Sequence, residues 1–258
     1  MNCKQNKRSV IPIIYMGSKS RISKDIVPII QKAIDDNNIN TYIEPFVGGA
    51  NVIDKIKCRK RIGNDLNVFL IELLKYVRDG GELPESISRE EYNVVRAAYN
   101  NKELDKFPLW YFGAVGFLAS YNGRWFDGGY AQAGYTKTKN GLRYRDYYRE
   151  AKENLLKQAP NLDGIKFICS DYRAIDYHHA VIYCDPPYMN TKQYSISRNF
   201  DYDTFWGTMR KWSKTNIVYI SELRAPDDFE CVWEKEVSRS IKVNDRSRAV
   251  EKLFKWKG

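Results

Sequence analysis

The chain has 258 residues, of which 42 are Lys or Arg and 32 are Asp or Glu, so its formal net charge is +10. This length suffices for one large domain, or one domain with a sizeable insertion, and for a core that needs neither disulfides nor metals. Hydrophobic residues make up 43% and charged residues 29%, which argues against an intrinsically disordered chain. No apolar run approaches the about 20 residues that span a bilayer, and the polar start of the chain has no signal-peptide core.

The five cysteines are scattered, odd in number and never in CxxC spacing: Cys3, Cys58, Cys169, Cys184 and Cys231. The sequence therefore predicts neither a zinc site nor a disulfide framework, and a reducing cytoplasm is the expected location. The positive charge and the 19 tyrosines favour a polyanionic partner whose bases stack on aromatic rings. Composition alone leaves an unspecific basic surface as the alternative.

The first third of the chain predicts an amphipathic helix followed by a β-α-β-α unit. In chain order, the expected elements are a helix over 23–34, a strand over 41–47, a helix through 52–56, a strand over 60–65 and a helix over 68–77. Pro28 is expected in the first turn of the opening helix, where its missing N–H costs nothing. This alternation is typical of a parallel sheet with ligand groups at its strand ends.

Residues 80–159 break this alternation. Helices are expected over 90–99 and 108–119, and the segment 121–135 is too rich in glycine for a helix or an ordinary strand. Afterwards, apolar runs predict buried core strands over 165–169, 180–184 and 216–220, and 229–237 with 239–243 as a terminal antiparallel pair. The simplest fold is a doubly wound, Rossmann-like α/β domain of residues 1–79 and 160–258, with a mostly helical insertion at 80–159.

The sharpest motif is Asp185-Pro186-Pro187-Tyr188, which follows an apolar strand directly. Ligands of open α/β sheets bind outside the carboxyl ends of the strands. Two prolines remove two N–H donors and keep the backbone extended, so the carbonyls are expected to stay unpaired. Together with the carboxylate they can accept hydrogen bonds from an amino group, and Tyr188 can stack on a planar base or a cation. A plain acidic turn is the structural alternative.

A second motif is Glu44-Pro-Phe46-Val-Gly48-Gly49-Ala50, at the end of the first strand. Glycines there let the backbone approach a ligand, and the N–H groups of a following helix point towards it. The pattern is neither G-x-G-x-x-G nor G-x-x-x-x-G-K-[ST], which disfavours a dinucleotide or P-loop site. Taken alone, this motif is best interpreted as a strand-to-helix turn.

Together these two motifs resemble the Dam-type DNA adenine-N6 methyltransferases, which use S-adenosylmethionine. The resemblance also includes Tyr15-Met-Gly-Ser-Lys19, Asn64-Asp65, Ser170-Asp171-Tyr172, Ile220-Ser221 and an N…R…E-x-L ending that contains Glu251. These matches follow one order from about residue 13 to residue 254. The resemblance implies a mostly parallel methyltransferase sheet with an antiparallel terminal strand, and no metal.

The resemblance assigns a role to each matched residue. The implied cofactor site contains Tyr15, Lys19, Phe46, Gly48, Asp65, Asp171, Tyr172 and Asp185. Asp65 would bond the ribose hydroxyls, and Asp171 the adenine amino group of the cofactor. Asp185 and the Pro186 carbonyl would hold the target amine, while Tyr188 stacks on the extruded adenine. Structural alternatives remain: a helix-start acid for Asp65, a turn acid for Asp171, a solvated charge for Lys19 and a core ring for Phe46.

The insertion is the expected reader of duplex DNA. Its candidate contacts are Tyr121, Asn122, Arg124, Lys137, Lys139 and Arg143. The Dam-type pattern has a base-reading arginine where this chain has Phe126, so a GATC recognition sequence does not follow. Arg124, two residues earlier, can still reach a guanine edge.

Other functions stay open at this point. The amine could belong to cytosine N4, an RNA adenine or a protein glutamine, or the chain could be an inactive DNA-binding relative. The aspartate of the Asp-Pro-Pro-Tyr motif disfavours two of the three other amines, and the long insertion favours duplex DNA. We expect a monomer or weak dimer that binds double-stranded DNA and no membrane.

Overall fold

The computed structural model describes Lys19 and residues 22–138, 141–188, 200–238 and 248–258. The described residues form two compact units: Lys19 and the described residues of 48–54 and 68–163 make the first, and those of 22–47, 55–67 and 164–258 the second. Each unit is described by itself below. In these parts of the chain, no helix is both long and apolar enough to cross a bilayer.

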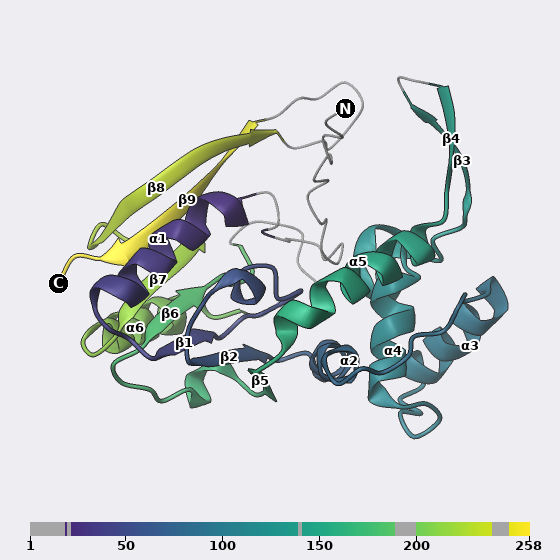
Figure 1. Ribbon diagram of the computed structural model, residues 1–258, viewed down its shortest axis with the longest axis horizontal. Helices are drawn as coiled ribbons and strands as arrows, with labels where there is room; N and C mark the ends of the chain where they lie inside the picture. The colour runs from purple at the N-terminus through teal and green to yellow at the C-terminus, as the bar shows by residue number, and fades with distance from the viewer. Residues whose placement is uncertain (1–18, 20–21, 139–140, 189–199, 239–247) are drawn as a thin grey trace, which may run out of the picture. The chain divides into compact units, whose positions relative to one another are not determined.

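The second unit is built on a seven-stranded sheet, counted over the described residues. Its strands are β1 (Thr41–Glu44), β2 (Lys60–Asp65), β5 (Ile165–Cys169), β6 (Val181–Cys184), β7 (Ile217–Glu222), β8 (Phe229–Ser238) and β9 (Arg248–Trp256). Their order is β5-β2-β1-β6-β7-β9-β8 (Figure 1). The first five are parallel, and β9 pairs antiparallel with both β7 and β8. This confirms the mostly parallel sheet with an antiparallel end.

Two helices pack on this sheet, α1 (Ser23–Asp36) and α6 (Tyr202–Ser213). On one face, Phe205 and Met209 of α6 join a core cluster with strand residues such as Ile43 and Ile182. Side chains alternate along a strand, so Tyr42 lies on the opposite face. The Pro28 prediction was wrong. α1 begins at Ser23, so Pro28 falls in its second turn, and the helix continues past it to Asp36.

The first unit is mostly helical. It holds α2 (Val68–Arg78), α3 (Arg89–Asn100), α4 (Leu109–Gly113) and α5 (Tyr147–Leu162). α4 continues as a π-helix, η3 (Ala114–Leu118), so the helix expected over 108–119 is present with a change of hydrogen-bond pattern. α3 begins with a capping box in which Ser88 and Glu91 bond each other's backbone N–H groups.

The glycine-rich segment forms short 3-10 helices, η4 (Tyr121–Gly123) and η5 (Trp125–Gly128). After it comes an antiparallel hairpin that was not expected from the sequence: β3 (Gly134–Thr138) and β4 (Gly141–Arg145) (Figure 1). The remaining short helices are η2 (Ile53–Lys55) and η6 (Tyr172–Ala174). The division into a catalytic and a recognition domain remains a prediction.

The terminal antiparallel pair differs from the expected one. β8 begins at Phe229 as expected, but its partner is β9, and the register runs from Phe229 opposite Trp256 to Ser238 opposite Arg248. Residues 239–243, the expected partner, lie outside the described residues. The apolar positions Leu253 and Phe254 of β9 are buried, which is why this later segment enters the sheet.

Candidate active site

The Asp185–Tyr188 motif leaves the sheet at its centre. β6 is buried along its whole length, Asp185 is half-buried and Pro186 is buried. The strand order reverses beside it, because β2 and β5 lie beyond β1 whereas β7 lies beyond β6. Open α/β sheets bind ligands at such a reversal, outside the carboxyl ends of the strands. The motif therefore stands where this architecture places a ligand.

Hydrogen bonds hold the motif on two sides. The Tyr202 hydroxyl donates to the Pro187 carbonyl at 2.6 Å, and the Tyr188 hydroxyl donates to Glu251 Oε2 at 2.8 Å. The expectation of unpaired carbonyls is thus wrong for Pro187. Neither proline can donate a hydrogen bond, so a donor from another element secures this stretch of backbone through its carbonyl.

Acidic side chains gather at the ends of the central strands. Glu44 ends β1 and accepts a hydrogen bond from the Tyr42 hydroxyl at 2.7 Å, and Glu222 ends β7; each is 2% exposed. Burial raises the pKa of Tyr183, and the negative charges of Asp185 and Glu44 add to the shift. Tyr183 stays protonated and shares a hydrogen bond of 2.8 Å with Ser221. In a chain of net charge +10, these strand ends offer negative charge to a cation.

Asp65 lies at the end of β2. Its Oδ1 accepts a hydrogen bond from the Asn67 backbone N–H at 3.0 Å, which holds the turn into α2. The residue before it, Asn64, is buried and donates to the carbonyls of Pro45 and Ser170 at 3.0 and 2.9 Å. The ends of β1, β2 and β5 are therefore joined through one amide.

Asp171 follows β5 and is engaged by its neighbour. Its carboxylate accepts from the Arg173 backbone N–H and from two guanidinium nitrogens, the shortest contact being 2.6 Å. Arg173 thereby lowers the pKa of Asp171 and keeps it ionised. A carboxylate has about four acceptor positions, so capacity for one more donor remains.

An aromatic cluster stands beside these strand ends. The Phe46 ring lies 5.1 Å from that of Tyr172, 5.9 Å from Phe200 and 6.0 Å from Phe205. Phe205 is fully buried, whereas the other three rings are half-buried. Phe46 thus fits both expectations, a core ring and a cofactor-site residue. The cluster extends the core and also presents ring surface at the ends of β1 and β5.

The glycine motif departs from expectation. Gly48 has a φ of 47° and Ala50 a φ of 56°, both left-handed, and only the 3-10 helix Ile53–Lys55 follows. No α-helix starts there because left-handed residues cannot continue a right-handed helix. Instead, the buried Gln158 amide of α5 donates to the carbonyls of Gly49 and Ala50, each at 3.0 Å.

The Tyr15-Met-Gly-Ser-Lys19 motif lies at the edge of the described residues, which include only its Lys19. Lys19 is 8% exposed, so it is not the solvated surface charge that was the alternative. Tyr15 lies outside the described residues.

A known family matches most of the chain. The family model of the D12 class N6 adenine-specific DNA methyltransferases matches residues 15–221. The match runs from Tyr15 to Ser221 and so takes in both the Gly48 and the Asp185 motifs. The chain belongs to this family.

Individual relatives of this methyltransferase carry consistent names. Type II methyltransferase M.MjaIII of Methanocaldococcus jannaschii is 27% identical over 223 residues, 73% of each chain. Type II methyltransferase M.FokI of Planomicrobium okeanokoites is 25% identical over 73% of this chain and 30% of its own length. Modification methylase StsI of Streptococcus sanguinis is 26% identical over 70% of this chain and 29% of its own length. The chain spans about a third of the latter two.

Likeness to solved structures is distant. The rRNA methyltransferase AviRa of Streptomyces viridochromogenes is aligned over 99% of this chain and 91% of its own, at 9% identity and a TM-score of 0.39. That similarity is too low to bear on the substrate.

In this DNA methyltransferase, the expected recognition residues divide between surface and core. Tyr121 is 47% exposed, Asn122 is exposed with a left-handed φ of 56°, and Arg124 is half-buried. Phe126 is 2% exposed and packs on Tyr92 and Tyr99, so it is a core residue. The surface of this segment is therefore the turn, with Arg124 at its end.

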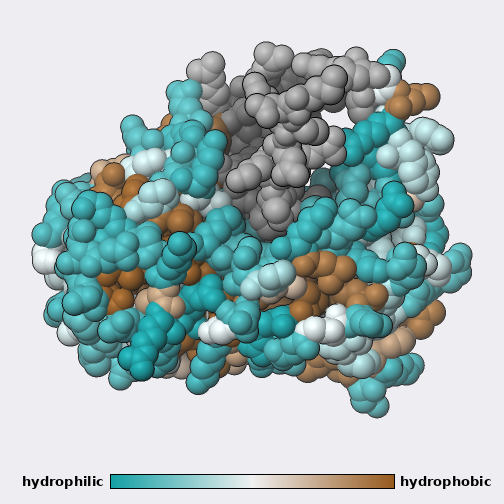
Figure 2. Space-filling view, in the orientation of Figure 1, coloured by the Kyte–Doolittle hydropathy of each residue, from teal (hydrophilic) through white to brown (hydrophobic). Residues whose placement is uncertain are grey.

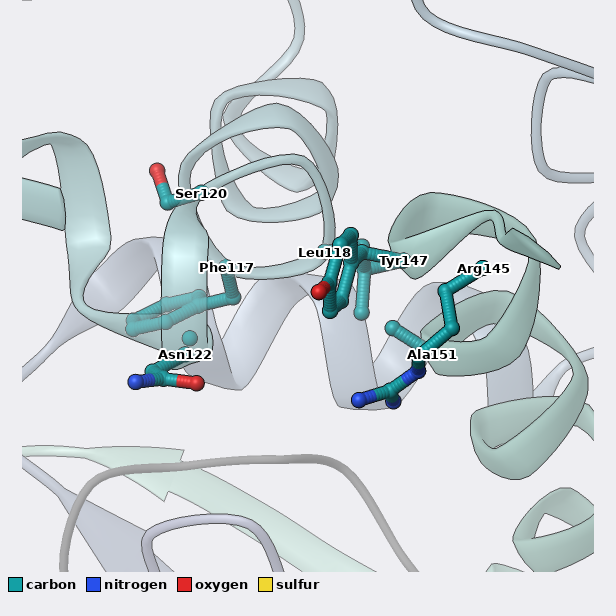
Figure 3. A pocket seen from close by; sticks show the side chains of 8 residues that line it. Phe117, Leu118, Ser120, Asn122, Arg145, Tyr147 and Ala151 are labelled. Atoms are coloured by element: carbon teal, nitrogen blue, oxygen red, sulfur yellow. The ribbon is translucent and has the colours of Figure 1, made fainter. Parts of the chain in front are cut away.

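A small pocket lies next to that turn, within the first unit. Asn122 lines one side, and Arg145 and Tyr147 line the other (Figure 3). The Arg145 guanidinium lies 4.5 Å from the centre of the Tyr147 ring and also pairs with Glu150. The foot of the hairpin thus adjoins the turn, and Arg145 is held in place there.

The hairpin carries exposed cations and rings. Lys137 is exposed, the Arg143 side chain is 69% exposed, and the rings of Tyr135 and Tyr144 meet across the strands at 5.4 Å. Leu142 is 74% exposed, and Figure 2 shows hydrophobic surface near the end of the hairpin, one of several such patches on this face. Lys139 lies outside the described residues.

Sequence reasoning missed four residues that shape the site: Asn64 as a junction of strand ends, Phe200, Tyr202 and Glu251. Asn64 and Glu251 stood within quoted motifs, but nothing in their spacing indicates their partners. Tyr202 starts a helix that was not predicted, although Asp201 is an N-cap residue whose carboxylate accepts from the Thr204 N–H. That cap was the available signal.

Proposed function

We propose that this methyltransferase moves a methyl group from S-adenosylmethionine to N6 of an adenine turned out of duplex DNA, at the carboxyl ends of β1 and β6. One observation carries the proposal. The Asp185-Pro-Pro-Tyr segment leaves a buried central strand at the reversal of the strand order, and its carboxylate and carbonyls are hydrogen-bond acceptors. Acceptors are what an exocyclic amine needs.

The chain's residues fit the cofactor. Asp65 at the end of β2 suits two ribose hydroxyls. The half-buried rings of Phe46 and Tyr172 offer a face for adenine, and Asp171 beside them keeps acceptor capacity for its amino group. Glu44 and Asp185 supply negative charge towards a cation. We propose Lys19, Gly48 and Tyr15 as further lining residues.

Methyl transfer then depends more on how the target amine is positioned than on a strong acid or base in the site. When bound, S-adenosylmethionine supplies an electrophilic methyl group on a positively charged sulfur. Asp185 and the Pro186 carbonyl accept the two amine hydrogens, which directs the nitrogen lone pair away from the ring and towards the methyl carbon. As the new N–C bond forms and the methyl–sulfur bond breaks, the sulfur would keep the bonding electron pair and the amine would pass one proton, by way of the Asp185 carboxylate, to water. Fixed alignment of this kind supplies several kcal/mol of the rate enhancement, about 7–11 in the best intramolecular cases.

Duplex DNA is the proposed partner of the first unit. Exposed Lys137 and Arg143 suit phosphates, whereas Arg124 next to the Tyr121–Asn122 turn suits a guanine edge. Extruding the adenine costs a few kcal/mol of stacking, and Tyr188 provides a replacement stack. We further propose that the protein works as a monomer or weak dimer in the cytoplasm of a bacterial or phage-infected cell.

The test is methyl transfer from labelled S-adenosylmethionine to unmethylated genomic DNA, followed by nucleoside analysis. N6-methyladenine in duplex DNA is the expected product. N4-methylcytosine, or transfer only to RNA or protein, would overturn the adenine assignment. Loss of transfer in Asp185→Ala shows that the label is not moved by a contaminating enzyme.

A further inference from the structure

Two side chains outside the Asp185–Tyr188 motif hold it from different elements. Tyr202 lies at the start of α6, 15 residues beyond Pro187, and Glu251 lies on β9, 63 residues beyond Tyr188. Both contacts are within the second unit. Neither residue has a role assigned by the comparisons with known proteins.

Tyr202 is itself well fixed. It occupies the first residue of α6, whose N-cap Asp201 accepts hydrogen bonds from the Thr204 N–H at 3.0 Å and the Thr204 hydroxyl at 2.6 Å. Its ring packs against Phe200 with centroids 5.0 Å apart. Because Pro186 and Pro187 have no N–H groups, a carbonyl is the only backbone group there that another element can hold. The bond from Tyr202 to Pro187 therefore sets the direction of the neighbouring peptide planes.

Glu251 holds the other end of the motif. It pairs with Lys235 in the β8–β9 register, and its carboxylate accepts the Tyr188 hydroxyl. Burial and the charges of Asp185 and Glu251 raise the pKa of Tyr188, so the hydroxyl keeps its proton and remains a donor. A bond at the tip of the ring restricts rotation about both side-chain torsions, and so it sets the plane of the ring.

We propose that Glu251 and Tyr202 are positioning residues of the methyl-transfer site: Glu251 sets the plane on which the extruded base stacks, and Tyr202 sets the backbone that presents the Pro186 carbonyl to the amine. This inference rests on the proposed function, because it concerns the same site. It adds a donor on α6, Tyr202, and an acceptor on β9, Glu251. Both act by holding the Asp185–Tyr188 motif and do not touch the substrate.

The consequence is kinetic. Losing either bond should leave the fold and cofactor affinity intact, because neither bond contacts the residues proposed for the cofactor's ribose and adenine. Transfer itself should slow, since misplacement of reacting groups by about 1 Å costs roughly a hundredfold in rate. We expect a fall of about tenfold or more in the single-turnover rate constant for Glu251→Ala and for Tyr202→Phe.

The decisive experiment is a double-mutant cycle. Glu251→Ala, Tyr188→Phe and the double variant are compared by single-turnover transfer to a duplex carrying the recognition site, with melting temperature and S-adenosylhomocysteine affinity measured beside it. If Glu251 acts through the Tyr188 hydroxyl, the double variant is no slower than the slower single variant. Glu251→Gln, whose amide oxygen can still accept, should recover part of the rate. Glu234→Gln, on the adjoining strand in a surface pair with Lys252, is the matched control and should transfer normally.

Each result has one meaning. The role of Glu251 would be overturned if the fold loss of rate in the double variant equalled the product of the two single-variant losses. A wild-type rate in Glu251→Ala would overturn it as well. A wild-type rate in Tyr202→Phe would overturn the role of Tyr202. If the wild-type enzyme methylates no adenine, the proposed function falls and this inference with it, whereas active wild-type enzyme with unaffected variants refutes the positioning roles alone.

Discussion

Asn64 and Ser170 exchange three hydrogen bonds across the ends of β2 and β5. The Asn64 amide donates to the Ser170 carbonyl at 2.9 Å, and its Oδ1 accepts from the Ser170 N–H at 3.0 Å and the hydroxyl at 2.9 Å. A fourth bond, to the Pro45 carbonyl, ties in the end of β1. Asp65 and Asp171, the two acids proposed for the cofactor, each adjoin one partner of this junction.

Replacing Asn64 should therefore affect both the fold and the cofactor. Asn64→Ala deprives the buried Pro45 carbonyl and the half-buried N–H and carbonyl of Ser170 of their side-chain partner, and we expect a loss of about 3 kcal/mol or more in the free energy of unfolding. Ser170→Ala removes one side-chain bond and should cost about 1 kcal/mol. Urea denaturation and S-adenosylhomocysteine calorimetry measure both effects. Equal stabilities for the two variants would contradict the junction.

Asp185→Ala should abolish transfer without unfolding the protein, because Asp185 lies after β6 and is half-buried. Single-turnover transfer and circular dichroism check this. Asp36→Ala, which removes an exposed acid paired with Lys32 in the last turn of α1, is the control. Turnover near the wild-type level in Asp185→Ala would rule out its catalytic assignment.

Asp65→Ala should weaken cofactor binding more than DNA binding. Its carboxylate stands at the second strand end, where a ribose is bound in sheets of this type. Calorimetry with S-adenosylhomocysteine and a DNA-binding titration give the two affinities. Glu72→Ala on α2, in an ion pair with Lys75, is a matched acid removal and should leave both unchanged. If Asp65→Ala keeps its cofactor affinity, Asp65 serves only the turn into α2.

Cations of the first unit should fall into two classes of mutant. Lys137→Ala and Arg143→Ala should weaken binding to all DNA and lower the salt dependence by a slope of about 0.9 per lost phosphate contact. Arg124→Ala should relax the recognition sequence, reducing the penalty for a wrong base by about 1 kcal/mol or more. Sequencing of methylated sites separates the classes. An Arg124→Ala enzyme with unchanged stringency would place base reading elsewhere.

Asp228 should make stability sensitive to acid. Hydrogen bonds from Arg210 and Trp256 lower its pKa to about 2, so the ionised form stabilises the fold above the ordinary value near 4. That contribution is lost as the pH falls from about 4 towards 2. The difference in melting temperature between wild type and Asp228→Asn should be present near neutral pH and shrink in acid. A difference that stays constant with pH would contradict this.

Local patterns predicted the sheet well. β5 matches its prediction residue for residue because it is a short, mostly apolar run. β2 does too, although only Ile62 in it is a large apolar residue, because it ends in an acid just before the apolar helix α2. β1 ends at Glu44 instead of Val47, since the next residue is Pro45 and the chain then turns. The helix expected after Gly49 is absent because Gly48 and Ala50 adopt left-handed conformations that the sequence does not reveal.

The sequence did not predict which side chains, far apart along the chain, form hydrogen bonds with each other. The hairpin did carry a signal, Asn140-Gly141, a dipeptide typical of tight hairpins, within residues of alternating polarity. No comparable signal pairs Glu251 with Tyr188 or Asn64 with Ser170, because those contacts depend on how the strands are ordered. The motif residues were thus predictable, whereas the side chains that hold them were not.

The place of β9 has a consequence for synthesis. Because β9 lies between β7 and β8, β8 has no neighbour among the described strands of the sheet until β9 has been made. Glu251 arrives with the same strand. A nascent chain can therefore form its parallel strands first, yet it completes the support of Tyr188 only once β9 has been made.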